Sequence, residues 1–343
     1  MEKTLALKSR LNSTFGILSL FSVVSGAISI ISAILYFIAQ IIIDGFSLGE
    51  AVYLKSNFYC LFIIPQFLLP ISTALLACLI PVIGKFKFRS CIKKEKVPVV
   101  YSLLSVLIFP GLSTVFSYIS YMISELFNMI GIPVGDINSA IPTPNGLGEI
   151  FLLFFVMAVL PAICEELIYR GFVLTGLSEY GKVGAVVVSS IAFGLMHATV
   201  QQIPFAFAIG LFLGYIAIRF NSIVLPMVLH FINNFIACLF MVLQEYVDYA
   251  LLNNISLCVD IFFVAVAVLA LAIFIILSVH EKKDKVSMFQ IDSANIAEYT
   301  KDSPEYTKAD FLSAVMHSWG FWLFTVIYLF TTVINIAVMQ LSI

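Results

Sequence analysis

The chain has 343 residues, of which 61% are hydrophobic and only 11% are charged. A soluble domain carries about 25% charged residues because it must wet its surface, so this composition excludes an ordinary soluble protein. The net charge of −2 is small and points to no nucleic-acid partner. The six cysteines form no C-x-x-C pair, and we expect them to act as small apolar residues in or near helices.

The hydrophobic residues occur in runs that are too long for a buried core helix. A helix needs about 20 apolar residues to cross a hydrocarbon core of about 30 Å. These runs are continuously apolar, whereas barrel strands alternate, and helices satisfy their own backbone hydrogen bonds in lipid. The predicted fold is an all-α, polytopic transmembrane helical bundle, with eight core helices and a ninth C-terminal helix. In chain order, the predicted helices are 15–43, 57–84, 98–130, 149–177, 184–199, 203–220, 222–244, 252–279 and 314–340.

The connections divide the chain into five segments. Residues 1–148 hold the first three helices, and residues 149–244 hold the next four, where the polar motifs described below are found. Residues 245–280 hold helix eight, and residues 313–343 hold the additional helix. Between these two, residues 281–312 mix both charge signs with Ser and Thr, and we expect a solvated cytoplasmic linker with one short helix.

Lysine and arginine are distributed unevenly over the connections. Lys3, Lys8 and Arg10 precede the first helix, and six more cations lie between Lys85 and Lys96. With a cytoplasmic amino terminus, alternating the connections puts 17 of the 18 Lys and Arg residues on one side, as the positive-inside rule requires. We therefore expect a multi-pass protein of the plasma membrane, with its amino terminus in the cytoplasm and the lipid bilayer as its immediate surroundings.

Polar side chains are concentrated in predicted helices four, five and seven. Charged groups inside a spanning helix cost several kcal/mol, so they are candidates for function by default. Helix four contains the sequence EELIYR, helix five ends in FGLMH, and helix seven contains HFINN. The candidate residues are Glu165, Glu166, Arg170, His197, His230 and Asn234.

Spacing separates the two adjacent glutamates. Glu166 and Arg170 stand four residues apart on one helix face, where a salt bridge would neutralise both. Glu165 lies about 100° around the helix and has no partner in its own segment. His230 and Asn234 are also four apart, so both face the same neighbouring element.

We expect four of these residues, Glu165, His197, His230 and Asn234, to line one water-accessible cavity in the inner half of the membrane. There a carboxylate can take a proton from water, and an imidazole or amide can stabilise an oxyanion. Alternatively, Glu165, His197 and His230 could bind zinc, because His₂Glu with an open position is a catalytic zinc arrangement. The H-E-x-x-H zinc signature is absent from the sequence, and both mechanisms stay open.

These motifs resemble those of the CPBP family of CAAX proteases and bacteriocin-processing enzymes. That family carries E-E-x-x-x-R, F-x-x-x-H and H-x-x-x-N/D on successive core helices. Here the three motifs occur complete and in that order, beginning at Glu165, Phe193 and His230, and the similarity covers residues 149–240. Each motif alone is weakly specific, whereas three in order within membrane helices are specific.

The resemblance implies an intramembrane endopeptidase of the type II CAAX prenyl endopeptidase kind. Glu165 would be the general base, and His197 would help to activate water. His230 and Asn234 would steady the oxyanion, while Glu166 and Arg170 would be structural. The implied partner is a hydrophobic or lipidated substrate: a membrane-associated protein, a prenylated CAAX-like protein or a leader peptide. The family is described both as metalloproteases and as metal-independent glutamate proteases.

Two other classes of function are compatible with the sequence. A transporter also places charged groups at mid-membrane, although transporters usually have paired broken helices and an internal repeat that this chain lacks by eye. A non-catalytic relative could act as a regulatory or bacteriocin-immunity protein for another membrane protein. The complete motifs favour the protease over both alternatives.

Overall fold

The computed structural model describes residues 2–46, 57–132, 134, 143–284 and 307–342, and every regular element in these ranges is helical. In chain order the elements are α1 (Glu2–Phe46), the π-helix η1 (Asn57–Ile63), α3 (Ile64–Ala77), α4 (Leu79–Ile83), the 3₁₀ turn η2 (Phe88–Cys91), α5 (Val99–Met129), α6 (Leu147–Phe154), the π-helix η4 (Phe155–Val159), α7 (Leu160–Glu166), the π-helix η5 (Leu167–Val173), α8 (Leu174–Ser178), α9 (Lys182–Met196), α10 (Gln202–Phe220), α11 (Val224–Leu243), α12 (Tyr249–Asp284), α14 (Lys308–Met316) and α15 (Trp319–Ser342).

The predicted transmembrane bundle is confirmed. Within the described residues, eight helices are long and apolar enough to cross a membrane, and α9 is a shorter apolar helix of 15 residues. Each predicted helix corresponds to one of these nine. Helix four, for example, is predicted over 149–177 and is the continuous run of α6 to α8, from Leu147 to Ser178.

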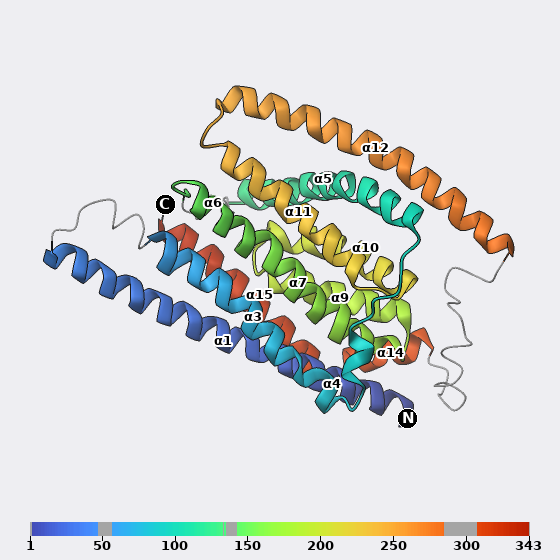
Figure 1. Cartoon of the computed structure of the whole chain (residues 1–343). Helices are drawn as coiled ribbons and strands as arrows, with labels where there is room; N and C mark the ends of the chain where they lie inside the picture. The colour runs from blue at the N-terminus through green and yellow to red at the C-terminus, as the bar shows by residue number, and fades with distance from the viewer. Residues whose placement is uncertain (1, 47–56, 133, 135–142, 285–306, 343) are drawn as a thin grey trace.

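The helices pack as a bundle with the motif-bearing helices in its interior (Figure 1). On one side α12 packs along α5, and on the other α1 packs along both α3 and α15. Between them lie α7, α9, α10 and α11. The α5–α12 contact is very close at Gly111, where a Cβ atom would lie 2.4 Å from the Ala267 Cβ and 2.5 Å from the Phe263 carbonyl oxygen. Small residues permit this kind of approach between membrane helices.

Segments predicted to share one side of the membrane meet at one end of the bundle. Arg10 of α1 forms an ion pair with Glu179 at 3.0 Å and lies 4.7 Å from the centre of the Phe86 ring. These contacts join the amino-terminal helix to the connection after α4 and to the turn after α8. Arg219 of α10 pairs with Glu281 of α12 at 3.4 Å, and the alternation of the connections predicts the same side of the membrane for this pair.

The ninth helix is divided into two parts and packs against the first helix. α12 extends to Asp284, and α14 begins at Lys308, so helix enters both ends of the predicted 281–312 linker, whose middle lies outside the described residues. At the junction of α14 and α15, the Ser318 hydroxyl and the Gly320 N–H both donate to the Asn12 side-chain oxygen, at 2.8 and 3.1 Å. Phe321 packs edge-on against Phe15, with ring centres 5.1 Å apart.

The orientation of the bundle can be tested by labelling. We expect Ser90→Cys to be shielded from a membrane-impermeant maleimide in intact cells, and Asn145→Cys to react, because the positive-inside rule places residue 90 in the cytoplasm. Both substitutions belong in a background that lacks the six native cysteines. Labelling of both variants after permeabilisation is the control. Reaction at position 90 alone in intact cells would reverse the proposed orientation.

Candidate functional site

The helix that carries the two adjacent glutamates departs twice from α-helical geometry. The π-helices η4 and η5 flank the seven-residue α7, and Glu165 and Glu166 are the last two residues of α7. Pro161 near the start of α7 has no N–H to donate to the preceding turn. π-Helical stretches occur frequently at functional sites, because the extra residue per turn changes the direction in which side chains point.

Glu166 is the centre of a buried charge cluster. Its carboxylate is fully buried, and one oxygen, Oε1, accepts from Arg170 Nη1 at 2.7 Å and from His230 Nδ1 at 2.9 Å. The other oxygen, Oε2, has no hydrogen-bond partner, but the side chain has no exposed surface through which water could reach it. The predicted Glu166–Arg170 pair is thus confirmed, and it joins helix four to α11. The contact with His230 was not expected from the sequence, because i to i+4 spacing reports only neighbours within one helix.

Arg170 is held by three different kinds of contact. Besides the Glu166 pair, its Nη2 donates to the Gly210 carbonyl of α10 at 3.2 Å, and its guanidinium carbon lies 4.4 Å from the centre of the Phe193 ring. The side chain is 1% exposed. One buried arginine therefore fixes helix four against α9, α10 and, through Glu166, α11. A cation over an aromatic ring gains about 2 kcal/mol when desolvated, which offsets part of the cost of burial.

Glu165 has a different environment from its neighbour. Its carboxylate is 16% exposed, and the Oε2 atom is buried without a hydrogen-bond partner. The nearest charged partner is His230, whose Nε2 lies 3.9 Å from Oε2. A polar atom that is buried without a partner is uncommon in native proteins, and it often marks a catalytic group or the position of a bound water. The prediction that Glu165 lacks a partner in its own segment stays a prediction.

His197 lies immediately beyond the last residue of α9, as its C-terminal cap. Its Nδ1 makes a 2.9 Å hydrogen bond to the Phe193 carbonyl oxygen. Since a carbonyl oxygen can only accept, Nδ1 carries the proton, and in the neutral ring Nε2 is left with a free lone pair. The same logic applies to His230, whose Nδ1 is bonded to the Glu166 carboxylate. Both imidazoles therefore present Nε2 as the nitrogen available for chemistry.

Phe193 brings the two histidines to one place. Its ring is edge-on to the His197 ring, with centres 5.1 Å apart, and edge-on to the His230 ring, with centres 5.7 Å apart. It also packs against Tyr169, one turn after Glu165, at 5.3 Å. The first residue of the F-x-x-x-H pattern thus contacts all three motif helices. The predicted water-accessible cavity lined by Glu165, His197, His230 and Asn234 stays a prediction.

The two asparagines of α11 have different partners. Asn233 accepts a hydrogen bond from the Ser113 hydroxyl of α5, so it joins two helices. Its amide nitrogen in turn donates to the Asn234 side-chain oxygen at 3.1 Å. This bond uses the acceptor of Asn234 and leaves the N–H₂ group of Asn234 as a donor.

A residue of the ninth helix supports the turn that carries His197. Ala198 follows His197 with a left-handed φ of +52°, a conformation that costs a non-glycine residue about 1–2 kcal/mol. The Asn335 side-chain amide donates to the Ala198 carbonyl at 2.8 Å. This contact was missed by sequence reasoning because the two residues are 137 positions apart. An asparagine in an apolar run is the signal that could have drawn attention to it.

The comparison with known families agrees with this site. Residues 147–236 match the family model described as Type II CAAX prenyl endopeptidase Rce1-like. That segment confirms the resemblance to the CPBP family. It contains all six candidate residues and runs from the start of α6 into α11. Searches of curated proteins and of solved structures returned no match.

The Rce1-like segment supports a CAAX-type intramembrane endopeptidase in general. Within the described part of the chain, no group of three or more His, Cys, Asp or Glu side chains is placed so that it could hold a metal ion. The assignment of Glu165, His197 and His230 as zinc ligands therefore stays a prediction.

The charge cluster of the Rce1-like segment predicts different effects for its two glutamates. Glu166→Gln leaves the buried Arg170 guanidinium without its counter-charge, which should cost about 3–5 kcal/mol of folding free energy. We expect low yield and earlier thermal unfolding of the purified protein. Glu165→Gln and the exposed control Glu245→Gln should both unfold near the unsubstituted protein. Equal destabilisation by the Glu165 and Glu166 substitutions would contradict this division.

A second prediction concerns the turn after α9. Asn335→Leu removes the donor to the Ala198 carbonyl, so we expect about 1–2 kcal/mol lower stability and faster amide hydrogen exchange over residues 197–203. The matched control is Val333→Ala, at an exposed position of the same helix. Unchanged exchange in that turn would show that α15 does not hold it.

Proposed function

We propose that the protein is an intramembrane endopeptidase that uses Glu165 to activate water. It would hydrolyse a peptide bond in its substrate, which would be a membrane-associated protein, a prenylated CAAX-like protein or a leader peptide. One observation supports this most: a buried Glu165 oxygen without a hydrogen-bond partner lies 3.9 Å from the free Nε2 of His230. That spacing leaves the two groups near one another without a direct bond, so both are available to a third molecule.

In the first step Glu165 acts as general base. Its carboxylate takes one proton from a water molecule, and the water oxygen attacks the carbonyl carbon of the scissile bond. The free Nε2 of His197 accepts a hydrogen bond from the same water and orients it. The Glu165 side chain is partly exposed, so a water molecule can reach its carboxylate.

The second group of residues stabilises the tetrahedral intermediate. The Asn234 amide N–H₂ can donate to the oxyanion directly. His230 can donate from Nε2 only as the doubly protonated imidazolium, because its Nδ1 proton is already given to Glu166. The Nδ1 bond to Glu166 fixes the orientation of the ring. Glu166 would thus support the oxyanion site as well as pairing with Arg170.

Collapse of the intermediate completes the reaction. The carbon–nitrogen bond breaks, and the proton held by Glu165 passes to the leaving nitrogen, which departs as an amine. The other product is a carboxylic acid that ionises in water. The general base is regenerated without a net change, and no covalent enzyme intermediate is formed.

The proposal is tested by cleavage of a fluorogenic farnesylated CAAX peptide by the purified full chain in lipid nanodiscs. Glu165→Gln should lower kcat by about 10²–10⁴-fold, the typical contribution of a general base. Glu245→Gln is the matched carboxylate control and should retain activity. An unprenylated peptide of the same sequence tests whether the lipid group is required.

Two results would overturn the assignment. Activity that persists in Glu165→Gln would remove the general base proposed here. Complete inactivity of the unsubstituted chain towards prenylated, unprenylated and leader peptides would favour the regulatory or immunity role instead.

Metal dependence needs its own measurement. The two histidines use only Nδ1 in their hydrogen bonds, so each Nε2 could serve either water or a metal. If Glu165 activates water without a metal, we expect no stoichiometric zinc by elemental analysis and activity that survives a chelator. Stoichiometric zinc, with activity that is lost on chelation and restored by zinc, would instead assign Glu165, His197 and His230 as ligands.

A further inference from the structure

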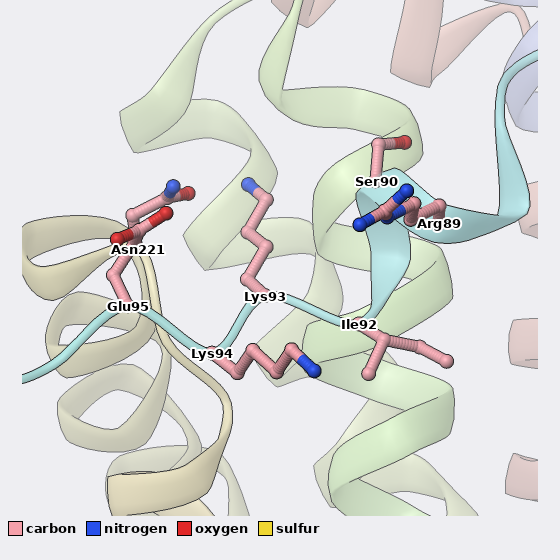
Figure 2. Close-up of a pocket in the computed structure, with 7 residues that line it drawn as sticks. All are labelled: Arg89, Ser90, Ile92, Lys93, Lys94, Glu95 and Asn221. Atoms are coloured by element: carbon pink, nitrogen blue, oxygen red, sulfur yellow. The ribbon is translucent and has the colours of Figure 1, made fainter.

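A pocket of about 480 Å³ lies between the connection that precedes α5 and the turn that precedes α11 (Figure 2). Arg89, Lys93 and Lys94 supply three cations to its lining, and Glu95 supplies one carboxylate. In the view of Figure 2, Lys93 is drawn between the end formed by Glu95 and Asn221 and the end that contains Arg89. The pocket is outside the group of residues proposed for hydrolysis.

The three cations of this pocket differ in their ion pairing from the three arginines elsewhere in the chain. In the chain as far as it is described, no ion pair joins a carboxylate to Arg89, Lys93 or Lys94. By contrast, the three other arginines, Arg10, Arg170 and Arg219, each pair with a glutamate within 3.4 Å. The pocket therefore carries an excess of two positive charges over its single carboxylate, which favours an anionic ligand.

Lys93 is the most buried of these three cations. Burial lowers the pKa of its ammonium group, and the nearby charge of Lys182 lowers it further, while Cys91 acts in the opposite direction. A partly desolvated ammonium without a carboxylate partner is less stable than one in water. A bound anion would replace the lost solvation at this position.

The surroundings of the pocket indicate which anion is available. Ile92, which lines the pocket, is 43% exposed, and Phe88 on the preceding turn is 44% exposed. The connection joins the candidate span that ends with α4 to α5, and Val99 at the start of α5 is 71% exposed. Cations interleaved with exposed apolar side chains at the end of spanning helices are typical of the lipid headgroup level, where they attract anionic lipids.

We propose that this pocket binds the phosphate headgroup of an anionic phospholipid. The apolar residues beside it would contact the acyl chains. Binding does not depend on the proposed protease activity, so the two proposals can fail separately.

The pocket is linked to the helix that carries His230. The Ile223 N–H donates to the Lys93 carbonyl at 2.9 Å, and Lys94 forms an isolated β-bridge with Ser222. These residues form the turn that leads into α11 at Val224. A lipid held by the side chains of Lys93 and Lys94 would therefore fix the start of the helix on which His230 lies.

The test is native mass spectrometry of the purified full chain, titrated with phosphatidylglycerol and separately with phosphatidylcholine. We expect phosphatidylglycerol to bind at least about tenfold more tightly, since each nearby cation contributes on the order of a fivefold preference for anionic lipid. The pocket variant, in which three cations become glutamine, should lose this preference. Its substitutions are Arg89→Gln, Lys93→Gln and Lys94→Gln.

A charge-matched control separates the pocket from general attraction. The control variant also removes three cations, but from outside the pocket, and should keep the preference within about twofold. Its substitutions are Lys8→Gln, Lys85→Gln and Lys96→Gln. Glu95→Gln removes the single carboxylate of the lining and should strengthen phosphatidylglycerol binding severalfold, a gain that misfolding cannot produce.

Three results would overturn the proposal. Equal loss in the pocket and control variants would show that the membrane attracts the whole basic surface. Unchanged preference in the pocket variant would place the lipid elsewhere. Displacement of the lipid by millimolar inorganic phosphate, with phosphate bound in its place, would make this a site for the free ion and not for a lipid.

Discussion

The fold of the motif-bearing helices depends on one carboxylate oxygen. Glu166 Oε1 accepts from Arg170 and from His230 at once, and Arg170 reaches on to the Gly210 carbonyl and the Phe193 ring. These contacts join α7 and η5 to α9, α10 and α11 through a single buried pair. In lipid no hydrophobic effect draws helices together, so polar contacts and close packing must set their positions. Removing one member leaves an uncompensated charge in a low dielectric, which makes the arrangement all-or-none.

The same cluster explains how two adjacent glutamates can differ in chemistry. Each has an Oε2 atom without a hydrogen-bond partner, but Glu166 is fully buried and its Oε1 is used twice, whereas the Glu165 side chain is 16% exposed and lies 3.9 Å from His230 Nε2. Because consecutive residues point about 100° apart on a helix, the pair divides into a fixed and a free carboxylate. His230 lies between them, with Nδ1 on Glu166 and Nε2 towards Glu165. Structural and reactive groups are thus coupled through one imidazole ring.

Much of the bundle could be predicted from the sequence because a bilayer leaves few choices. Long apolar runs must be helices, and four-residue spacing identifies the Glu166–Arg170 pair directly. Contacts between helices are not encoded in local spacing, so the bond from His230 to Glu166 could not be foreseen. The π-helical turns on either side of α7 also escape a pattern based on 3.6 residues per turn. The six candidate residues were named from the sequence, and their assignment to one site stays a prediction.

The helices outside the Rce1-like segment do more than anchor it. Residues 147–236 match the family, yet polar contacts to the segment also come from elsewhere in the chain, among them one from each of α5, α1 and α15. Ser113 of α5 bonds to Asn233, Arg10 of α1 bonds to Glu179, and Asn335 of α15 bonds to Ala198. The last of these matters most, because a strained left-handed residue follows His197 and the Asn335 amide satisfies its carbonyl. α15 itself is positioned by α1 through the Asn12 contacts. The first and last helices of the chain therefore act together on the position of His197, so the matched segment excised alone would lack the partner that satisfies this turn.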